Sequence, residues 1–247
     1  MAESRPVIVT GASRGVGYAL VRQLLSQGSS VVGIARERPD LAEGPNFQFV
    51  SCDLCVPDDV AALVARLIPL RPRGLINNAA LQTEADFTRL APADLVRLVQ
   101  ADIAVDLVAP LTLSYGLFDT ITSHPGGFIC NINSVLAFAP KLSAGAYCPA
   151  KAGLANATIA LRALAQRQPD CLVSQVVLPL VDTDMTQGRG SGKISADAAA
   201  SAILDGLRRS RSEIWVGQVR VLRLLRRLAP GVTSRMLLGE PAPAPSA

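Results

Sequence analysis

P-V-I-V-T-G-A-S-R-G-V-G-Y-A-L-V-R-Q-L-L, residues 6–25, sets the architecture of the whole chain. The apolar run at its start predicts a short buried strand, and the periodic apolar residues from Tyr18 onward predict an amphipathic helix. Between them, three glycines allow a tight turn and a close approach of the backbone to a pyrophosphate. The start of the helix then offers free N–H groups and a favourable dipole to phosphate. This unit therefore predicts a dinucleotide-binding site.

The end of the next strand indicates which dinucleotide binds. The apolar run 30–35 predicts that strand, and in this architecture an acid at its end would bind the adenosine ribose. Arg36 stands there instead, and Arg14 lies in the glycine-rich turn. Two guanidinium groups suit a ribose 2′-phosphate, which favours NADP(H) over NAD(H). The alternative is that Glu37 or another acid holds the ribose.

Strands and helices alternate along the rest of the chain. The strands are nearly continuous apolar runs, as expected for a parallel sheet that is covered on both faces. We predict one Rossmann-type α/β domain, a doubly wound parallel sheet of about seven strands, over residues 1–235, with a flexible tail at 236–247. Further strands are expected at 47–51, 74–80, 127–133, 171–178 and 213–217, and helices at 58–70, 91–119 (interrupted near Pro110), 146–167 and 195–209.

Composition narrows the class of protein. The chain has 247 residues, of which 49% are apolar and 18% charged, and its mean hydropathy is +0.32. It shows neither a run long enough to span a membrane nor a signal peptide, and its five cysteines are an odd number. We therefore expect a cytoplasmic protein with reduced thiols and no membrane partner. The chain has one histidine and one C-x-x-C pair (Cys52 and Cys55), which argues against a metal site. We expect these two cysteines to pack in the core rather than to take part in redox chemistry.

Positive charge is concentrated near the C-terminus. Residues 208–235 hold eight arginines and one acid, a local charge of +7, so the remainder carries about −3 of the net +4. Within this segment, residues 219–228 predict an amphipathic basic helix. It could meet a membrane surface or an acidic carrier protein, or it could pack on its own subunit or a neighbour, which we prefer. No helix-turn-helix or aromatic-basic pattern indicates nucleic acid.

A second stretch carries the chemistry. Residues 134–151 read S-V-L-A-F-A-P-K-L-S-A-G-A-Y-C-P-A-K. Ser134 ends a predicted strand, and Tyr147 and Lys151 lie four apart, on one face of the helix that follows. An isolated tyrosine has a pKa of about 10, which a neighbouring cation moves toward the working range. Tyr147 could then exchange a proton with a carbonyl oxygen that Ser134 holds. The alternative is that Tyr147 and Lys151 form a surface pair without a catalytic role, which is common on helices.

Residues 5–217 resemble the short-chain dehydrogenases/reductases of the classical type, because five motifs of that family occur here in the same order and at the same spacing. The motifs are T-G-A-S-R-G-V-G at 10–17, C-D-L at 52–54, N-N-A at 77–79, Ser134, and Y-x-x-x-K at 147–151. The resemblance implies that Tyr147 is the acid/base, that Ser134 orients the carbonyl, and that Lys151 lowers the tyrosine pKa and holds the nicotinamide ribose. The cofactor contacts that it implies, together with the two arginines, are Gly11, Ser13, Arg14, Val16, Arg36, Asp53, Leu54, Asn78, Ala79, Tyr147, Lys151, Val181 and Thr183. Asn77 is expected to be structural, and Asp53 either meets the adenine amine or caps the next turn.

Two positions depart from the family pattern. Asp106 stands where the family has an asparagine as its fourth catalytic residue, and an ionised carboxylate there would partly neutralise Lys151 and raise the pKa of Tyr147. Leu180 replaces a glycine, which would narrow the pocket and, at a positive φ, strain the backbone. The glycine-rich loop 186–193 falls where the family places a substrate lid, and the apolar run 135–140 would form a pocket wall beside an apolar or aromatic carbonyl substrate.

These features lead to one expected function and to alternatives from other classes. The leading expectation is an NADP(H)-dependent oxidoreductase that interconverts a small ketone or aldehyde with an alcohol through Tyr147. One alternative, motivated by Asp106 and Leu180, is a cofactor-binding sensor or scaffold with little catalysis. Another is a different reaction on the same cofactor, such as dehydration or imine reduction. The resemblance also implies a homodimer or homotetramer.

Overall fold

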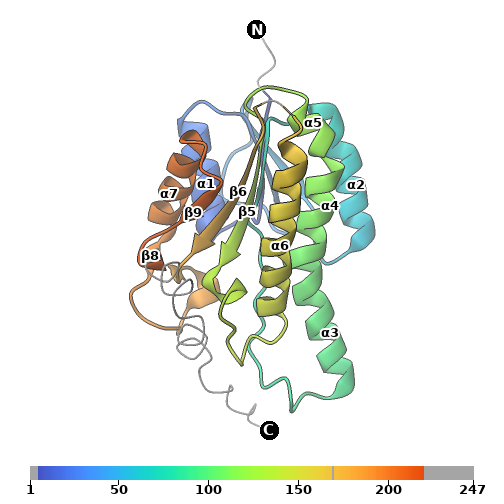
Figure 1. Cartoon of the computed structure of the whole chain (residues 1–247), viewed down its shortest axis with the longest axis vertical. Coiled ribbons are helices and arrows are strands. Elements are labelled where there is room, and N and C mark those ends of the chain that lie inside the picture. Colours follow the sequence, from blue (N-terminus) through green and yellow to red (C-terminus); the bar gives the residue numbers. More distant parts are fainter. Residues whose placement is uncertain (1–4, 169, 220–247) are drawn as a thin grey trace.

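Seven parallel strands form the centre of the protein (Figure 1), in a computed structural model that describes residues 5–168 and 170–219. Their order across the sheet is β3-β2-β1-β4-β5-β6-β9, and every neighbouring pair is parallel. The predicted doubly wound sheet and its seven strands are confirmed. The strands are β1 (Val7–Thr10), β2 (Val31–Ala35), β3 (Phe47–Ser51), β4 (Gly74–Asn77), β5 (Phe128–Ser134), β6 (Leu172–Leu178) and β9 (Glu213–Trp215).

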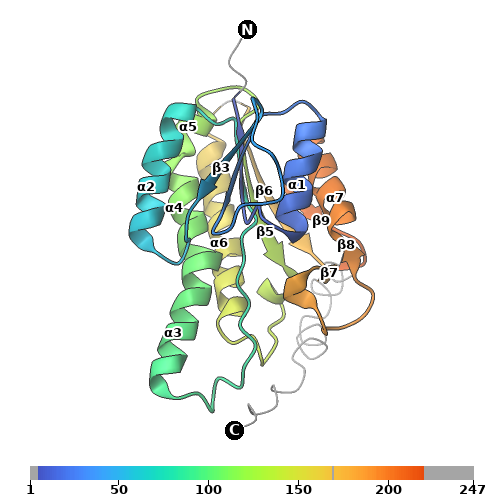
Figure 2. The same cartoon turned by 180° about the vertical axis from the view of Figure 1, so that it is seen from behind.

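Helices cover both faces of the sheet (Figures 1 and 2). α1 (Gly15–Ser26) and α7 (Ala196–Arg208) pack on one face, and α2 (Pro57–Leu67), α4 (Ala109–Gly116) and α6 (Tyr147–Ala165) pack on the other. Each layer buries its own apolar cluster against the strands. This double cover explains why β1 and β2 are buried at every residue, whereas the edge strand β3 has buried, intermediate and exposed positions.

The order of the strands fixes where a ligand can bind. From β1 the chain moves outward through β2 to β3, then returns to the other side of β1 and continues from β4 toward β9. The direction of winding therefore reverses between β1 and β4. In open α/β sheets, ligands bind beyond the carboxyl ends of the strands at such a reversal. The glycine-rich turn after β1 and the Asn-Asn-Ala segment at the end of β4 meet at this point.

The long helix after β4 is interrupted differently from the prediction. α3 (Pro92–Ile103) leads into a π-helical turn, Ala104–Val108, which leads in turn into α4. The N–H of Ala109 bonds to the carbonyl of Ala104, five residues back. Pro110 lies in the first turn of α4 and cannot donate to the carbonyl four residues earlier, so the irregularity falls before it. Such π turns often occur at functional sites. The shorter helices are α5 (Phe118–Thr122) and the 3-10 turns Ile68–Leu70, Val135–Ala137 and Asp184–Thr186.

A small second sheet was not predicted. β7 (Val181–Asp182) and β8 (Ile194–Ser195) pair in parallel and enclose the glycine-rich loop 186–193. Each strand has only two residues, too few for a period-two pattern to appear in the sequence. The Ser195 side chain then caps α7 by accepting a hydrogen bond from the N–H of Ala198.

The predicted basic helix 219–228, except for Val219, and the predicted tail 236–247 lie outside the described residues. Over the described ranges, no helix is both long enough and apolar enough to cross a membrane. All five cysteines lie in these ranges and are free thiols.

Candidate active site

A cleft of about 820 Å³ opens at the carboxyl edge of the sheet. Its size is ordinary for a small-molecule or cofactor site. The cleft gathers residues from both predicted motifs and from the loops between them. Of the predicted site residues, those that line it are Gly11, Ser13, Arg14, Val16, Arg36, Asp53, Leu54, Asn78, Ala79, Ser134, Tyr147, Lys151, Val181 and Thr183. Asp106 is the exception, because it lies fully buried behind the cleft wall.

The glycine-rich turn is shaped for a close approach. Gly11 has φ +68°, and a Cβ on it would lie 2.8 Å from the Cα of Ala79. Asn78 braces the turn, since its side chain donates to the carbonyl of Thr10 and its N–H bonds to the Thr10 hydroxyl. Arg14, at the start of α1, makes no side-chain cap for this helix. The first N–H groups of α1 are therefore available to an anion at the mouth of the turn, and the site fits a pyrophosphate.

The cleft also contains the predicted selectivity residues. Arg14 and Arg36 both line it, and Glu37, the alternative ribose ligand, lines it too. Arg14 lies 3.9 Å from the carboxylate of Asp184 in an exposed ion pair, which screening makes weak. Asp53 also faces the cleft, and its Oδ1 accepts a hydrogen bond from the N–H of Cys55. It thus caps the turn after β3.

The predicted catalytic residues line the same cleft. Ser134 is the last residue of β5, Tyr147 opens α6, and Lys151 follows one turn later. The Lys151 Nζ atom lies 5.6 Å from the centre of the Tyr147 ring. Burial raises the pKa of Tyr147 well above its ordinary value, and the negative charge of Asp106 raises it further. A hydrogen bond with the Ser134 side chain acts in the opposite direction. Tyr147 is therefore a protonated phenol in this environment.

A buried ion pair lies directly behind Tyr147. The Lys151 Nζ atom is 3.0 Å from Asp106 Oδ1 and donates to the carbonyl of Ile132 at 3.1 Å. Both charged side chains are almost fully buried. Burial raises the pKa of the Asp106 carboxyl from 3.8 to about 6, although the charge of Lys151 and the N–H of Leu81, which donates to Oδ2, act to lower it. Asp106 lies in the π-helical turn, and its carboxylate contacts Lys151 directly.

Polar residues inside β5 support the site and were not predicted as part of it. The Asn133 side chain donates to the carbonyl of Lys151 and so fixes the start of α6. Asn131 joins Thr158 of α6 to Asn77 of β4, and the Asn77 Nδ2 atom donates to Asn131, to the Ser114 hydroxyl and to the carbonyl of Pro110. The structural role expected for Asn77 agrees with this buried network. Two asparagines at alternate positions of an otherwise apolar strand were the signal in the sequence.

The substrate end is formed by three loops. From the predicted wall 135–140, only Val135 and Leu136 line the cleft, whereas Phe138 stacks on Trp215 with ring centres 5.4 Å apart. Leu180 lines the cleft as expected, but its φ is not among the positive values of the described residues, so it adds no backbone strain. Loop 186–193 reaches the cleft as well. Sequence reasoning missed the charged residues here, Glu84, Lys141 and Arg189, because they are far apart in the chain.

The C-x-x-C pair has no features of a reactive site. Burial raises the pKa of the Cys52 thiol to about 11 and also raises that of Cys55. A thiol of high pKa is a poor nucleophile near neutrality. Across residues 5–168 and 170–219, no group of three or more histidine, cysteine or acidic residues is placed to hold a metal ion.

Residues 5–193 match the family model for short chain dehydrogenases. The chain belongs to the short-chain dehydrogenase family. It is 30% identical over 229 residues to an uncharacterized oxidoreductase, DltE, of Bacillus subtilis (strain 168), a match that covers 88% of this chain and 90% of DltE. It is thus an oxidoreductase of this family.

Solved structures share its fold. A short chain dehydrogenase from Burkholderia cenocepacia J2315, in complex with NADP, superposes with a TM-score of 0.82 at 25% identity over 96% of this chain and 99% of the other. A short-chain dehydrogenase from Sphingobium yanoikuyae in complex with NADPH gives a TM-score of 0.77 at 22% identity, over 96% and 98% of the two chains. The second likeness speaks for the fold alone.

Proposed function

We propose that this oxidoreductase uses NADP(H) to interconvert a ketone or aldehyde with an alcohol, and that it works in the direction of reduction. The observation that carries the proposal is the shared cleft. Ser134, Tyr147 and Lys151, which would hold and protonate a carbonyl oxygen, line the same cleft as Arg14 and Arg36, which would hold the 2′-phosphate. The NADP-bound relative from Burkholderia cenocepacia supports the same cofactor.

Several parts of NADP(H) would each have a contact in the chain. The uncapped start of α1 would hold the pyrophosphate, and Arg14 and Arg36 would hold the 2′-phosphate. Val181 and Thr183 line the cleft where the carboxamide would lie, and Lys151 would hold the nicotinamide ribose. When bound, NADPH supplies a hydride to the carbonyl carbon.

The side chains of the protein handle the proton. The Ser134 hydroxyl orients the carbonyl oxygen and stabilises the negative charge that develops on it. Tyr147, a neutral phenol with a raised pKa, gives its proton to that oxygen. The ammonium group of Lys151 favours the phenolate that remains. Because Asp106 partly offsets this cation, the site favours the protonated phenol, which is the form needed for reduction.

Cofactor titration tests the first part of the proposal. NADPH and NADH binding would be followed by cofactor fluorescence in the wild type, in Arg36→Ala and in a control, Arg66→Ala, whose exposed side chain does not line the cleft. We expect a preference for NADPH that falls about tenfold or more in Arg36→Ala, because a charge-assisted phosphate contact is lost. The control should keep the preference. Equal binding of both cofactors by the wild type would contradict the NADP(H) assignment.

A carbonyl panel tests the second part. The wild type should oxidise NADPH in the presence of at least one ketone or aldehyde, and Tyr147→Phe should lower that rate by about a hundredfold or more because the proton donor is gone. Near-wild-type turnover by Tyr147→Phe would exclude the proposed mechanism.

A second candidate is a cofactor-binding protein with weak catalysis. The direct contact of Asp106 with Lys151 favours it, because the carboxylate offsets the cation that would stabilise a phenolate. This candidate predicts tight NADPH binding with no turnover across the panel. A large gain of activity in Asp106→Asn would then identify the carboxylate as the cause.

Two further proposals concern the setting of the enzyme. Its five free thiols favour a cytoplasmic location. We also propose one catalytic domain over residues 1–235 and assembly into a homodimer or homotetramer.

A further inference from the structure

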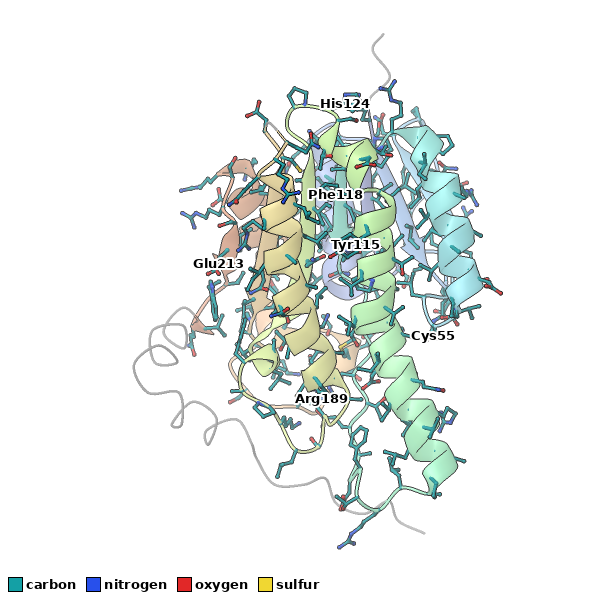
Figure 3. The ribbon with its side chains drawn as sticks, turned by 45° about the vertical axis from the view of Figure 1, so that its right-hand side comes forward. Cys55, Tyr115, Phe118, His124, Arg189 and Glu213 are labelled. Atoms are coloured by element: carbon teal, nitrogen blue, oxygen red, sulfur yellow. The ribbon has the colours of Figure 1, made fainter. Side chains whose placement is uncertain are left out.

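Three charged side chains from three separate loops meet at the substrate end of the cleft. Glu84 follows β4, Lys141 precedes α6, and Arg189 lies in loop 186–193 between β7 and β8. All three line the cleft. Figure 3 shows Arg189 at the end of α6 where the helix begins, which is the end that carries Tyr147. The positive charge of Arg189 is close enough to lower the pKa of Tyr147.

One carboxylate oxygen takes most of the contacts in this cluster. Glu84 Oε1 lies 2.7 Å from Lys141 Nζ and 3.3 Å from Arg189 Nη1. The Gln82 side chain donates to the same oxygen at 3.1 Å. Two cations thus share one carboxylate, and the cluster keeps one positive charge that it does not balance itself.

The Arg189 guanidinium is not fully used by these contacts. Its Nη1 atom approaches Glu84 without hydrogen-bond geometry and is itself buried, whereas the side chain as a whole is 25% exposed and lines the cleft. A ligand in the cleft that accepts from the exposed part of the guanidinium gains charge-assisted hydrogen bonds. The guanidinium fork matches a carboxylate in shape. Glu84 already shows that a carboxylate fits between these donors.

The loop that carries Arg189 is held in place before any ligand arrives. The Arg189 N–H bonds to the carbonyl of Thr186, and the Thr186 hydroxyl bonds back to the carbonyl of Val181. Lys193 donates to the carbonyl of Thr186 at 2.6 Å and lies 3.6 Å from Asp182. The opposite loop is also fixed, since the side chain of Asp102 accepts from both the N–H and the hydroxyl of Thr83, next to Glu84. The donors are therefore preorganised.

Apolar side chains also line this end of the cleft. Leu136, Leu180 and Met185 line it, and Gly190 lies so close to Leu180 that a Cβ on the glycine would be 2.8 Å from the leucine Cδ2. Arg189 is thus next to an apolar wall, and the surroundings suit a molecule with an apolar body and one anionic end.

From this arrangement we propose that the substrate is a carbonyl compound with a carboxylate, that its carboxylate binds Arg189 beside the Glu84–Lys141 pair, and that Arg189 is the residue that selects it. This inference rests on the proposed reductase activity for the identity of the reacting group. The anion site itself stands on the geometry of the three loops and can be tested without turnover.

Binding of a non-reactive pair tests the site directly. Benzoate and benzamide have the same ring, and only benzoate is anionic. They would be titrated into the complex of the protein with NADPH, with cofactor fluorescence as the readout. We expect the wild type to bind benzoate at least about tenfold more tightly than benzamide, because benzoate gains charge-assisted hydrogen bonds. Arg189→Met should reduce this ratio to about one, and Arg66→Met, far from the cleft lining, should leave it unchanged.

Two further variants keep the test independent of misfolding. Arg189→Lys retains the charge without the fork and should keep part of the preference for benzoate. Glu84→Gln removes the carboxylate that competes for the same donors and should tighten benzoate binding. Equal binding of benzoate and benzamide by the wild type, or a preference that persists in Arg189→Met, would overturn the proposal.

Turnover then distinguishes the two proposals. 4-Formylbenzoate and its methyl ester carry the same aldehyde, and the wild type should reduce the anionic one with the higher kcat/KM, again through Arg189. A protein that binds NADPH and prefers benzoate but reduces neither aldehyde nor any other carbonyl compound would retain the anion site and lose the reductase assignment. Reduction of both aldehydes with equal kcat/KM would support the reductase assignment and contradict the anion site.

Discussion

The contact between Lys151 and Asp106 is the feature that most distinguishes this site. A carboxylate in the place of an amide changes the charge beside the lysine, and the two groups are 3.0 Å apart in a buried setting. Removing one member of such a pair is usually destabilising, because the other charge is left without compensation. The pair also acts on Tyr147, whose pKa the Asp106 charge raises. One carboxyl group therefore influences both the stability of the fold and the proton chemistry.

Asp106→Asn should shift the pH dependence of catalysis. Without the carboxylate, the phenolate of Tyr147 is less disfavoured, so the pKa of Tyr147 falls. In alcohol oxidation, which needs the phenolate, the rise of kcat/KM with pH should move to lower pH by about one unit. The control is Asp102→Asn, one turn earlier and bonded to Thr83, which should move the profile much less. An unchanged profile in Asp106→Asn would show that the carboxylate does not act on Tyr147.

The same substitution should change how stability depends on pH. The pKa of Asp106 is about 6 in the folded protein and 3.8 ordinarily, so the folded state binds this proton more tightly. The tighter binding of this proton therefore stabilises the folded state fully below pH 3.8, and this stabilisation is lost as the pH rises through about 6. Over that window the wild type should lose on the order of 2–3 kcal/mol relative to Asp106→Asn. Urea unfolding of both proteins at a series of pH values measures the difference, and parallel curves would refute the shift.

Among the helices and strands, the long apolar runs were predictable and the irregular parts were not. β5 and β6 are largely apolar segments, and the alternation of strand and helix predicted that they belong to a parallel sheet. In the sequence only Pro110 hints at the π-helical turn Ala104–Val108, which carries Asp106. The pair β7–β8 is too short to have a pattern. The cleft residues that carry known motifs were predictable, whereas Arg189 and Glu84 meet only through tertiary structure.

The first turn of α1 allows a test of how tightly the glycine-rich turn is packed. A Cβ on Gly17 would overlap the carbonyl oxygen of Gly11 and the side chain of Asn78. Gly17→Ala should therefore push α1 away from the turn, cost about 1–3 kcal/mol of stability and weaken NADPH binding. Gly44→Ala is the matched control, because nothing lies within 4 Å of its added Cβ. Thermal unfolding and NADPH titration measure both effects, and equal behaviour of the two variants would contradict the packing argument.

Across the whole molecule, the two faces of the sheet have different roles. The face with α1 and α7 positions the glycine-rich turn, and the face with α4 and α6 positions Tyr147, Lys151 and Asp106 (Figure 2). The face with α4 and α6 also leaves apolar side chains on its outer surface. Figure 3 looks onto this surface, with Tyr115 labelled on α4. The exposed apolar residues of α3, α4, α6 and the π-helical turn are Val96, Val108, Tyr115, Ile159 and Leu164.

This surface should be where two copies of the chain meet. Ile159, on α6, is 61% exposed, and burying such a side chain against a partner contributes about 1.5–3 kcal/mol. We expect the wild type to sediment as a dimer or tetramer, and Ile159→Lys to shift the mass toward the monomer because it would place a charge in an apolar contact. Ile68→Lys is the control, since Ile68 is also exposed but lies after α2. A monomeric wild type, or an Ile159→Lys variant of unchanged mass, would show that these helices do not form the interface.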